Sequence, residues 1–235
     1  MIPTIGIDAR LSGLSHAGIG RYSAALIRRL VPRDEFRWWL LFSSEEQAEE
    51  GLQQPLDSLP DHIEIAISDT RHYSLREQTE IPRLFAEAEL DLLHVPHFNV
   101  PLLTAVRKQQ ALVVTIHDLL WHEQRGTQVT TLPWWQYWIK YLGYRLITRL
   151  AVTQADHILV PTEAVKQIVT NHYSETDTKI TATYEGLDQD WKEHGSNTAR
   201  AERKSDADQN ATQLVYVGSL YPHKNVSRVL EAAKQ

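Results

Sequence analysis

The stretch LVVTIHDLLWHE, residues 112–123, carries the pattern that decides the fold class. Its first five residues are almost continuously apolar, which is typical of a strand buried on both faces of a parallel sheet. The polar pair His117 and Asp118 follows where such a strand ends. Similar runs recur at Thr4–Asp8, Arg37–Ser43, Ile63–Ser68, Asp91–Val95, His157–Pro161, Ile180–Tyr184 and Leu214–Gly218.

Helical patterns lie between many of these runs. Their alternation with strands predicts an α/β fold, a parallel sheet covered by helices, with ligands at the carboxyl ends of the strands. Two apolar stripes at helical spacing are expected to pack on the sheet. They consist of Ile19, Tyr22, Leu26 and Leu30 in the first helix and of Trp135, Ile139, Leu142, Leu146 and Leu150 in a later one.

Composition excludes several classes of function. The 235 residues are 42% hydrophobic and 23% charged, as in an ordinary globular protein, and contain no cysteine, which rules out disulfides and thiolate catalysis. The formal charge of −6 argues against a dedicated nucleic-acid-binding protein. The first ten residues do not resemble a signal peptide, and no apolar run is long enough to span a membrane. We therefore expect a soluble, cytoplasmic protein.

One polar segment divides the chain. Residues 192–212, KEHGSNTARAERKSDADQNAT, contain no apolar side chain larger than alanine and read as a linker. The expected organisation is a domain over residues 1–191, the linker, and the first strand and helix of a second domain over residues 213–235.

The loop HAGIGRY, residues 16–22, lies between the first strand and the first helix. Gly18 and Gly20 allow a ligand to approach the backbone, and free amides at a helix start attract anions. Arg21 adds a planar cation suited to phosphate. The alternative is a plain turn before a helix. A dinucleotide-binding loop fits less well, because the third glycine of that motif would fall at Ser23.

His117 and Asp118 are a second candidate site, since functional groups gather at the carboxyl ends of parallel strands. A structural histidine is the alternative. Together with His94, His97 and His122, His117 also invites a metal interpretation, but the sequence lacks the His-Glu helical signature of zinc sites, so we expect no metal.

Seven motifs together resemble those of the retaining glycosyltransferases of family 4, in the same order and over nearly the whole chain. They are IGIDAR, GIGRY, DLLHVPHF, VVTIHDL, ADHILVPTEA, ITATYEGLD and LVYVGSLYPHKN. The resemblance implies the GT-B fold, in which two Rossmann-like domains face each other across a cleft. The first domain would hold the acceptor, and the second would hold a nucleotide-sugar donor, a UDP- or GDP-sugar.

The resemblance also implies roles for residues at matching positions. Gly18, Gly20 and Arg21 would lie near the donor phosphates, and Lys224 would contact the diphosphate beside Gly218. His117 would lie close to the reacting sugar. Three further residues are cleft candidates, namely Asp118, Glu163 and Ser219.

Two positions depart from the family pattern. Ser219 stands where many members have an arginine, and His223 stands where arginine is frequent, so we expect one charge-assisted contact to phosphate to be missing or neutral. Because the sequence ends soon after Lys224, we expect a truncated enzyme that is inactive alone. No metal or other cofactor is required, and an Asp-x-Asp motif is absent.

The sequence is compatible with three functions. The favoured one is sugar transfer with retention to an acceptor hydroxyl, in cell-envelope polysaccharide or glycolipid synthesis. A non-catalytic fragment that binds only the acceptor is an alternative, and a metal-dependent hydrolase is a weaker one. The segment 133–150 combines tryptophans and basic residues, which suggests peripheral contact with the inner face of a membrane. The alternative is a core helix whose exposed aromatic side chains are buried by the rest of the second domain. The family resemblance implies a glycan or lipid-linked acceptor.

Overall fold

The structure is a computed structural model that describes residues 2–13, 16–107, 109–123, 133–186, 214–218, 220 and 224–233. It separates into two compact units. Unit 1 comprises Met1–Leu120 and Lys140–Glu185, and unit 2 comprises Trp121–Ile139 and Gly186–Gln235. The expected linker at 192–212 and the expected boundary at residue 191 lie outside the described residues.

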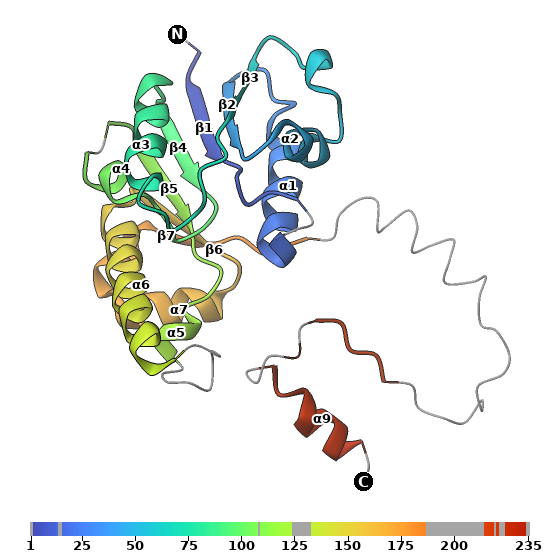
Figure 1. Ribbon diagram of the computed structural model, residues 1–235, viewed down its shortest axis with the longest axis vertical. Coiled ribbons are helices and arrows are strands. Elements are labelled where there is room, and N and C mark those ends of the chain that lie inside the picture. Colours follow the sequence, from blue (N-terminus) through green and yellow to red (C-terminus); the bar gives the residue numbers. More distant parts are fainter. Residues whose placement is uncertain are drawn as a thin grey trace, which may run out of the picture. The chain divides into compact units, whose positions relative to one another are not determined.

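Unit 1 is built on a parallel sheet of seven strands, in the order β3-β2-β1-β4-β5-β6-β7 (Figure 1). All six strand pairs are parallel. The strands are β1 (Thr4–Asp8), β2 (Arg37–Phe42), β3 (Ile63–Ile67), β4 (Leu92–Val95), β5 (Ala111–Thr115), β6 (His157–Val160) and β7 (Ile180–Ala182). The α/β fold and its Rossmann-like parallel sheet are thus as the apolar runs predict.

Helices connect the strands and cover the sheet (Figure 1). The described α-helices are α1 (Ala17–Leu30), α2 (Glu45–Leu52), α3 (Glu77–Glu87), α4 (Leu102–Arg107), α5 (Leu120–Glu123), α6 (Trp134–Gln154), α7 (Glu163–His172) and α9 (Val226–Ala232), of which α9 belongs to unit 2. The described residues also form two short 3-10 helices, η2 (Leu56–Ser58) and η4 (Ser174–Lys179).

Strand β2 shows why the apolar runs are continuous. Trp38 and Leu40 face the core beneath α1 and α2, whereas Trp39 and Leu41 face a second core that α3, α4, α6 and α7 contribute to. Successive side chains of a strand point to opposite faces, so a strand covered by helices on both sides needs apolar residues at every position.

The strand order reverses between β1 and β4. The chain runs outward from β1 through β2 to β3 and then returns to the other side of β1 to form β4. In open parallel sheets, the loops that leave such a pair of strands diverge and open a crevice at the carboxyl ends. Here that crevice lies above Asp8 of β1 and Val95 of β4.

The prediction of which face of α6 packs on the sheet is wrong. Trp135, Ile139, Leu142 and Leu146 are 51%, 65%, 65% and 54% exposed, whereas Tyr137, Tyr141, Thr148, Ala151 and Val152 are buried. The pattern offers two candidate faces, and the buried one carries smaller or hydroxyl-bearing side chains. In α1, similarly, Ala24 and Ile27 are buried, whereas the residues of the predicted stripe, Ile19, Tyr22, Leu26 and Leu30, are only partly buried.

The strand expected at 214–218 is not formed in the part of the chain that the structure describes, and Leu214, Val215 and Val217 are exposed. A strand needs neighbours for its hydrogen bonds, and none is paired with this segment. The helix expected to start near Asn225 is present as α9. No described helix is both long enough and apolar enough to cross a membrane.

Candidate active site at the carboxyl end of the sheet

His117 follows β5 and is held by three contacts. Its Nε2 lies 3.1 Å from the carbonyl oxygen of Pro96, so this nitrogen carries a proton, because a carbonyl only accepts. Its Nδ1 lies 3.6 Å from Oε1 of Glu185. The ring meets that of Tyr22 edge-on, with 4.8 Å between the centroids. The imidazole is therefore fixed, and Nδ1, at 3.6 Å from Glu185, is the nitrogen with the looser contact.

Tyr22 links this histidine to the loop at the start of α1. Its hydroxyl lies 3.3 Å from Oγ1 of Thr115, which in turn lies 2.8 Å from Nε2 of His94. Burial lowers the pKa of His94 to about 4, with the charge of His117 adding to the effect, so His94 is neutral at neutral pH. The motif GIGRY thus contributes a side chain that packs directly against His117.

The two glycines of that motif have different environments. A Cβ on Gly20 would lie 2.0 Å from the carbonyl oxygen of Gly13, so packing between the loop and the helix requires glycine there. A Cβ on Gly18 would meet nothing within 4 Å. Gly18 and Arg21 are both exposed at the start of α1, whose N-cap residue His16 makes no side-chain capping bond. Of the two glycines, Gly18 is therefore the one whose backbone a ligand can approach.

A buried polar cluster lies beneath the crevice, and sequence reasoning missed it. The guanidinium of Arg10, 0% exposed, makes a bidentate contact with Asp8, at 2.9 and 2.7 Å, and lies 3.0 Å from Oε1 of Glu77. Oε1 of Glu77 also lies 3.1 Å from Nδ1 of His72. The charged pair Asp-x-Arg immediately after an apolar strand was the only sequence signal available.

Asp8, Glu77 and Arg10 are all charged. Burial alone would raise the pKa of Asp8, but the charge and hydrogen bonds of Arg10 lower it below its ordinary value. Burial opposes ionisation of Glu77 too, and its contacts with His72 and Arg10 lower its pKa. The two carboxylates in turn raise the pKa of Arg10 against the effect of burial.

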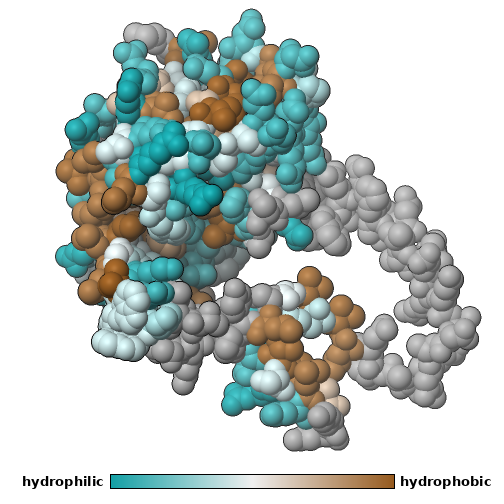
Figure 2. All heavy atoms as spheres, in the orientation of Figure 1, coloured by the Kyte–Doolittle hydropathy of each residue, from teal (hydrophilic) through white to brown (hydrophobic). Residues whose placement is uncertain are grey.

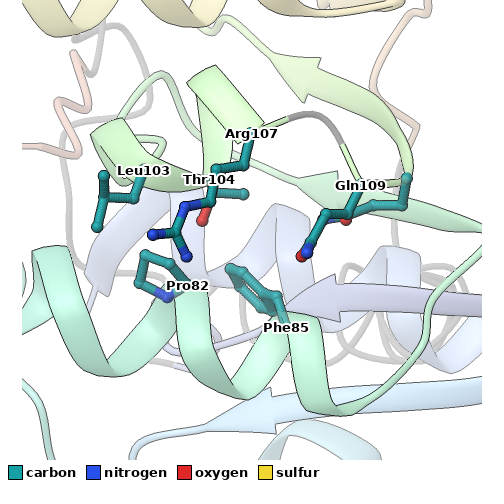
Figure 3. Close-up of a pocket in the computed structure, with 7 residues that line it drawn as sticks. Pro82, Phe85, Leu103, Thr104, Arg107 and Gln109 are labelled. Carbon is teal, nitrogen blue, oxygen red and sulfur yellow. The ribbon is translucent and has the colours of Figure 1, made fainter.

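A small cavity opens into this cluster. It is lined by Asp8, Leu11, His72, Val95, Pro96, His97 and Asn99, and thus lies at the strand-order reversal. Another cavity, drawn in Figure 3, lies between α3 and α4, lined by Pro82, Phe85, Leu103, Thr104, Arg107, Gln109 and Gln110. That second cavity adjoins the residues that precede β5, at the opposite end of the strands from His117.

The remaining candidates of unit 1 are near the surface. Asp118 is exposed, and its Oδ1 accepts a hydrogen bond from the amide of Leu120, which caps the start of α5. Glu163 is exposed as the first residue of α7, after the capping residue Thr162. Among the described residues, no hydrogen bond or ion pair joins either of them to His117, so a shared site for these residues stays a prediction.

The donor-side candidates lie in unit 2. Gly218 has a φ of +149°, which other residues adopt only with strain, and Lys224 is exposed just before α9. Ser219 lies outside the described residues. Within the same unit, the rings of Trp121 and Tyr137 lie 5.9 Å apart.

The histidines considered for a metal are engaged separately. His94 contacts Thr115, His97 accepts from the amide of Asn99, and His117 contacts Pro96. The described residues hold no group of three or more side chains placed to bind a metal ion.

The family model for Glycosyltransferase Family 4 matches residues 16–191, three quarters of the chain, and covers the loop after β4, His117 and Glu163. The chain belongs to glycosyltransferase family 4. The resemblance that the motifs indicated is thereby confirmed at the level of the family. No curated protein matched the sequence significantly.

Solved structures with a similar fold are distant. UGT2 of Phytolacca americana, in complex with UDP-2fluoro-glucose and pterostilbene, is 13% identical, with a TM-score of 0.46, over 80% of this chain and 55% of that one. The wall teichoic acid polymerase TagF is 15% identical, with a TM-score of 0.45, over 78% and 39%. A UDP-N-acetylglucosamine 2-epimerase is 12% identical, with a TM-score of 0.48, over 77% and 46%. This family 4 chain spans about half the length of these proteins, or less.

Proposed function

We propose that this family 4 chain carries the acceptor side of an enzyme that moves a sugar from a nucleoside diphosphate to an acceptor hydroxyl with retention at the anomeric carbon. The donor would be a UDP- or GDP-sugar, and the product a cell-envelope polysaccharide or glycolipid. The observation that carries the proposal is the fixed imidazole of His117 beside Tyr22, at the carboxyl end of the sheet of a family 4 domain.

The barrier to such a reaction is separation of charge between an oxocarbenium-like sugar and a departing diphosphate. Fixed cations and amide dipoles lower that barrier by stabilising the charge where it develops. In this proposal, the open backbone at Gly18 and the exposed Arg21 receive the diphosphate from one side. For Gly218 and Lys224 of unit 2, contact with the donor diphosphate is what the family resemblance implies, and the reaction requires no metal or other cofactor.

His117 would hydrogen-bond the reacting sugar or the acceptor through Nδ1. Because Nε2 is already committed to Pro96, the ring loses little further freedom on binding. Asp118, Glu163 and Ser219 would line the cleft, as the family resemblance implies.

The acceptor would be a glycan or a lipid-linked sugar, reached by peripheral contact with the cytoplasmic face of a membrane. An exposed face of α6 supports this proposal, because Trp134, Trp138 and the stripe from Trp135 to Leu146 are all about half exposed or more. Figure 2 shows that hydrophobic residues, in brown, reach the surface along the left side of the view. The described part of the segment, residues 133–155, contains no acidic residue. Aromatic and basic side chains on one helix favour an anionic lipid surface.

Donor binding can be tested by titrating UDP and GDP into the isotope-labelled protein and following amide resonances. We expect binding on the order of millimolar, about −4 kcal/mol, with the largest changes at Gly18, Ile19 and Arg21. Arg21→Ala should weaken it, and Arg107→Ala, an exposed arginine of α4, should leave it unchanged. Changes confined to other segments, or an Arg21→Ala variant that binds as well as the wild type, would argue against the proposed phosphate site.

A further inference from the structure

The cavity at the strand-order reversal has polar walls and little room. Its volume is about 10 Å³, enough for one group the size of a water molecule or a hydroxyl. Asp8 ends β1, and Pro96, His97 and Asn99 follow β4, so the walls come from the two loops that diverge at the reversal. A sugar ring cannot enter this space, but one of its hydroxyl groups can.

Asn99 is oriented by Glu77. Its Nδ2 lies 3.2 and 3.3 Å from the two carboxylate oxygens of Glu77, which can only accept because this side chain is ionised. The amide is therefore not free to flip, and Oδ1 is directed away from Glu77. Asn99 is 2% exposed, and its Oδ1 has no hydrogen-bond partner among the described residues. A buried acceptor without a partner is costly, so this atom invites a donor from a ligand.

Two imidazoles complete the walls. Nδ1 of His97 accepts a hydrogen bond from the amide of Asn99, and burial lowers the pKa of His97 to about 3, so Nε2 holds the proton as a donor. Nδ1 of His72 faces Glu77, and its Nε2 is buried without a partner in the described part of the chain. A hydroxyl group, which both donates and accepts, matches this mixture of partners.

The charge beneath the cavity acts against anions. Asp8 and Glu77 are both ionised and Arg10 is a cation, so these three groups sum to one negative charge, which His72, 3.1 Å from Glu77, offsets only when its ring is protonated. Charges in a low-dielectric interior are poorly screened, and a carboxylate or phosphate at the cavity mouth would be repelled.

We propose that this cavity selects the acceptor by taking one hydroxyl of a neutral sugar ring, with Asn99 and His72 as specificity-determining residues. Identifying the bound sugar as the acceptor rests on the proposed function, but binding of the sugar itself requires no nucleotide sugar. A site built to hydrogen-bond a hydroxyl rejects an analogue that lacks it, because its own polar groups are then left unpaired.

The test is a titration of the labelled protein, without any nucleotide, with methyl α-D-glucopyranoside and with glucuronate. We expect the neutral glycoside to bind on the order of millimolar and to shift the side-chain amide resonances of Asn99, and glucuronate to bind at least about tenfold more weakly. Absence of any shift up to about 100 mM glycoside, or equal binding of glucuronate, would overturn the proposal while leaving donor binding untouched.

Variants separate this site from a general effect on the fold. Asn99→Leu should weaken glycoside binding by about tenfold or more. His72→Asn keeps a donor facing Glu77 and removes Nε2, and it should weaken binding if Asn99→Leu proves unstable. Thr104→Val is the control, because Thr104 Oγ1 is likewise buried without a partner among the described residues but lies in the cavity of Figure 3. Equal binding by the wild type and a folded Asn99 or His72 variant would contradict the assignment.

Discussion

At the scale of single residues, Arg10 balances two carboxylates inside unit 1. Replacing it by methionine would leave Asp8 and Glu77 without their cation in a region that excludes water. Breaking a buried ion pair by removing one partner typically costs about 3–5 kcal/mol. We therefore expect Arg10→Met to lower the free energy of unfolding in urea by this amount.

The matched control for this prediction is Arg83→Met. Arg83 pairs with Glu87 one helical turn away in α3, and both side chains are more than half exposed. Such surface pairs contribute about 0–1 kcal/mol. Equal losses of stability in the two variants would show that the buried cluster is not a special stabilising feature.

The lowered pKa of His94 predicts how the stability of the fold depends on pH. Its pKa is lowered by burial from 6.5 to about 4, so between these values the unfolded chain binds a proton that the folded chain does not. Stability should therefore fall as the pH drops from about 6.5 to about 4, by about 3 kcal/mol for this residue. Below this window, protonation of Asp8 and Glu77, whose pKa values are lowered, removes further stability.

His94→Gln keeps an amide near the position that contacts Thr115 and cannot titrate in this range. Urea unfolding at a series of pH values should give a shallower slope between pH 6.5 and 4 for this variant than for the wild type. Identical slopes would mean that other groups cause the acid sensitivity.

The sequence placed some site residues and missed others, for a physical reason. His117 could be located because it follows an apolar strand directly. Glu77 and Asn99 could not, because Arg10 and Glu77 are 67 residues apart and Glu77 and Asn99 are 22 apart, and they meet only in the folded sheet. No local pattern records a contact of that kind.

At the scale of elements, the strands were easier to predict than the orientation of the helices. The central strands β2, β4 and β5 are largely buried on both faces, so their sequences have one interpretation. In α6, two faces are apolar enough to pack, and the face with Tyr137 and Tyr141 is the buried one. The stripe from Trp135 to Leu146 was therefore assigned to the wrong side.

The exposed face of α6 predicts binding to anionic vesicles. Arg145 and Arg149 lie on the helix near this face, and basic residues add about 1 kcal/mol each at an anionic surface. We expect co-sedimentation with vesicles of anionic lipid at low salt, less at high salt, and none with neutral vesicles.

Charge-reversal variants test whether the exposed face of α6 is the surface that binds the vesicles. Arg145→Glu with Arg149→Glu should abolish co-sedimentation, whereas Arg71→Glu with Arg107→Glu, which changes two exposed arginines elsewhere, should not. If the wild type fails to bind anionic vesicles at any salt concentration, the proposed membrane contact is wrong.

Residues 214–217 predict fast hydrogen exchange. They form no strand, and Leu214, Val215 and Val217 are exposed, whereas Leu112 and Val114 lie in the core of the sheet. Amides outside a paired ladder open at little cost in free energy. Exchange measured by mass spectrometry should be much faster at 214–217 than at 112–116, and equal protection in a monomer would contradict this.

At the scale of the whole molecule, the alternation of strands and helices predicts the α/β fold class. The family resemblance adds the expectation of a Rossmann-like domain and of roles for particular residues, which alternation alone does not give. Strand order depends on which strands pair in space, and the crevice exists because β4 adds beside β1 rather than β3. The side chains that meet there come from loops after β1, β3, β4 and β5. Their roles in catalysis stay predictions.

The most direct test of the proposed chemistry is turnover by the protein encoded by the complete reading frame that contains this sequence. UDP- and GDP-sugars would be supplied with a hexoside acceptor, and the anomeric configuration of the product would be read by NMR. We predict transfer with the configuration of the donor retained, and about a 10²-fold loss of kcat in His117→Ala with little change in Tm. An inverted product, or a His117→Ala variant with unchanged turnover, would contradict the account.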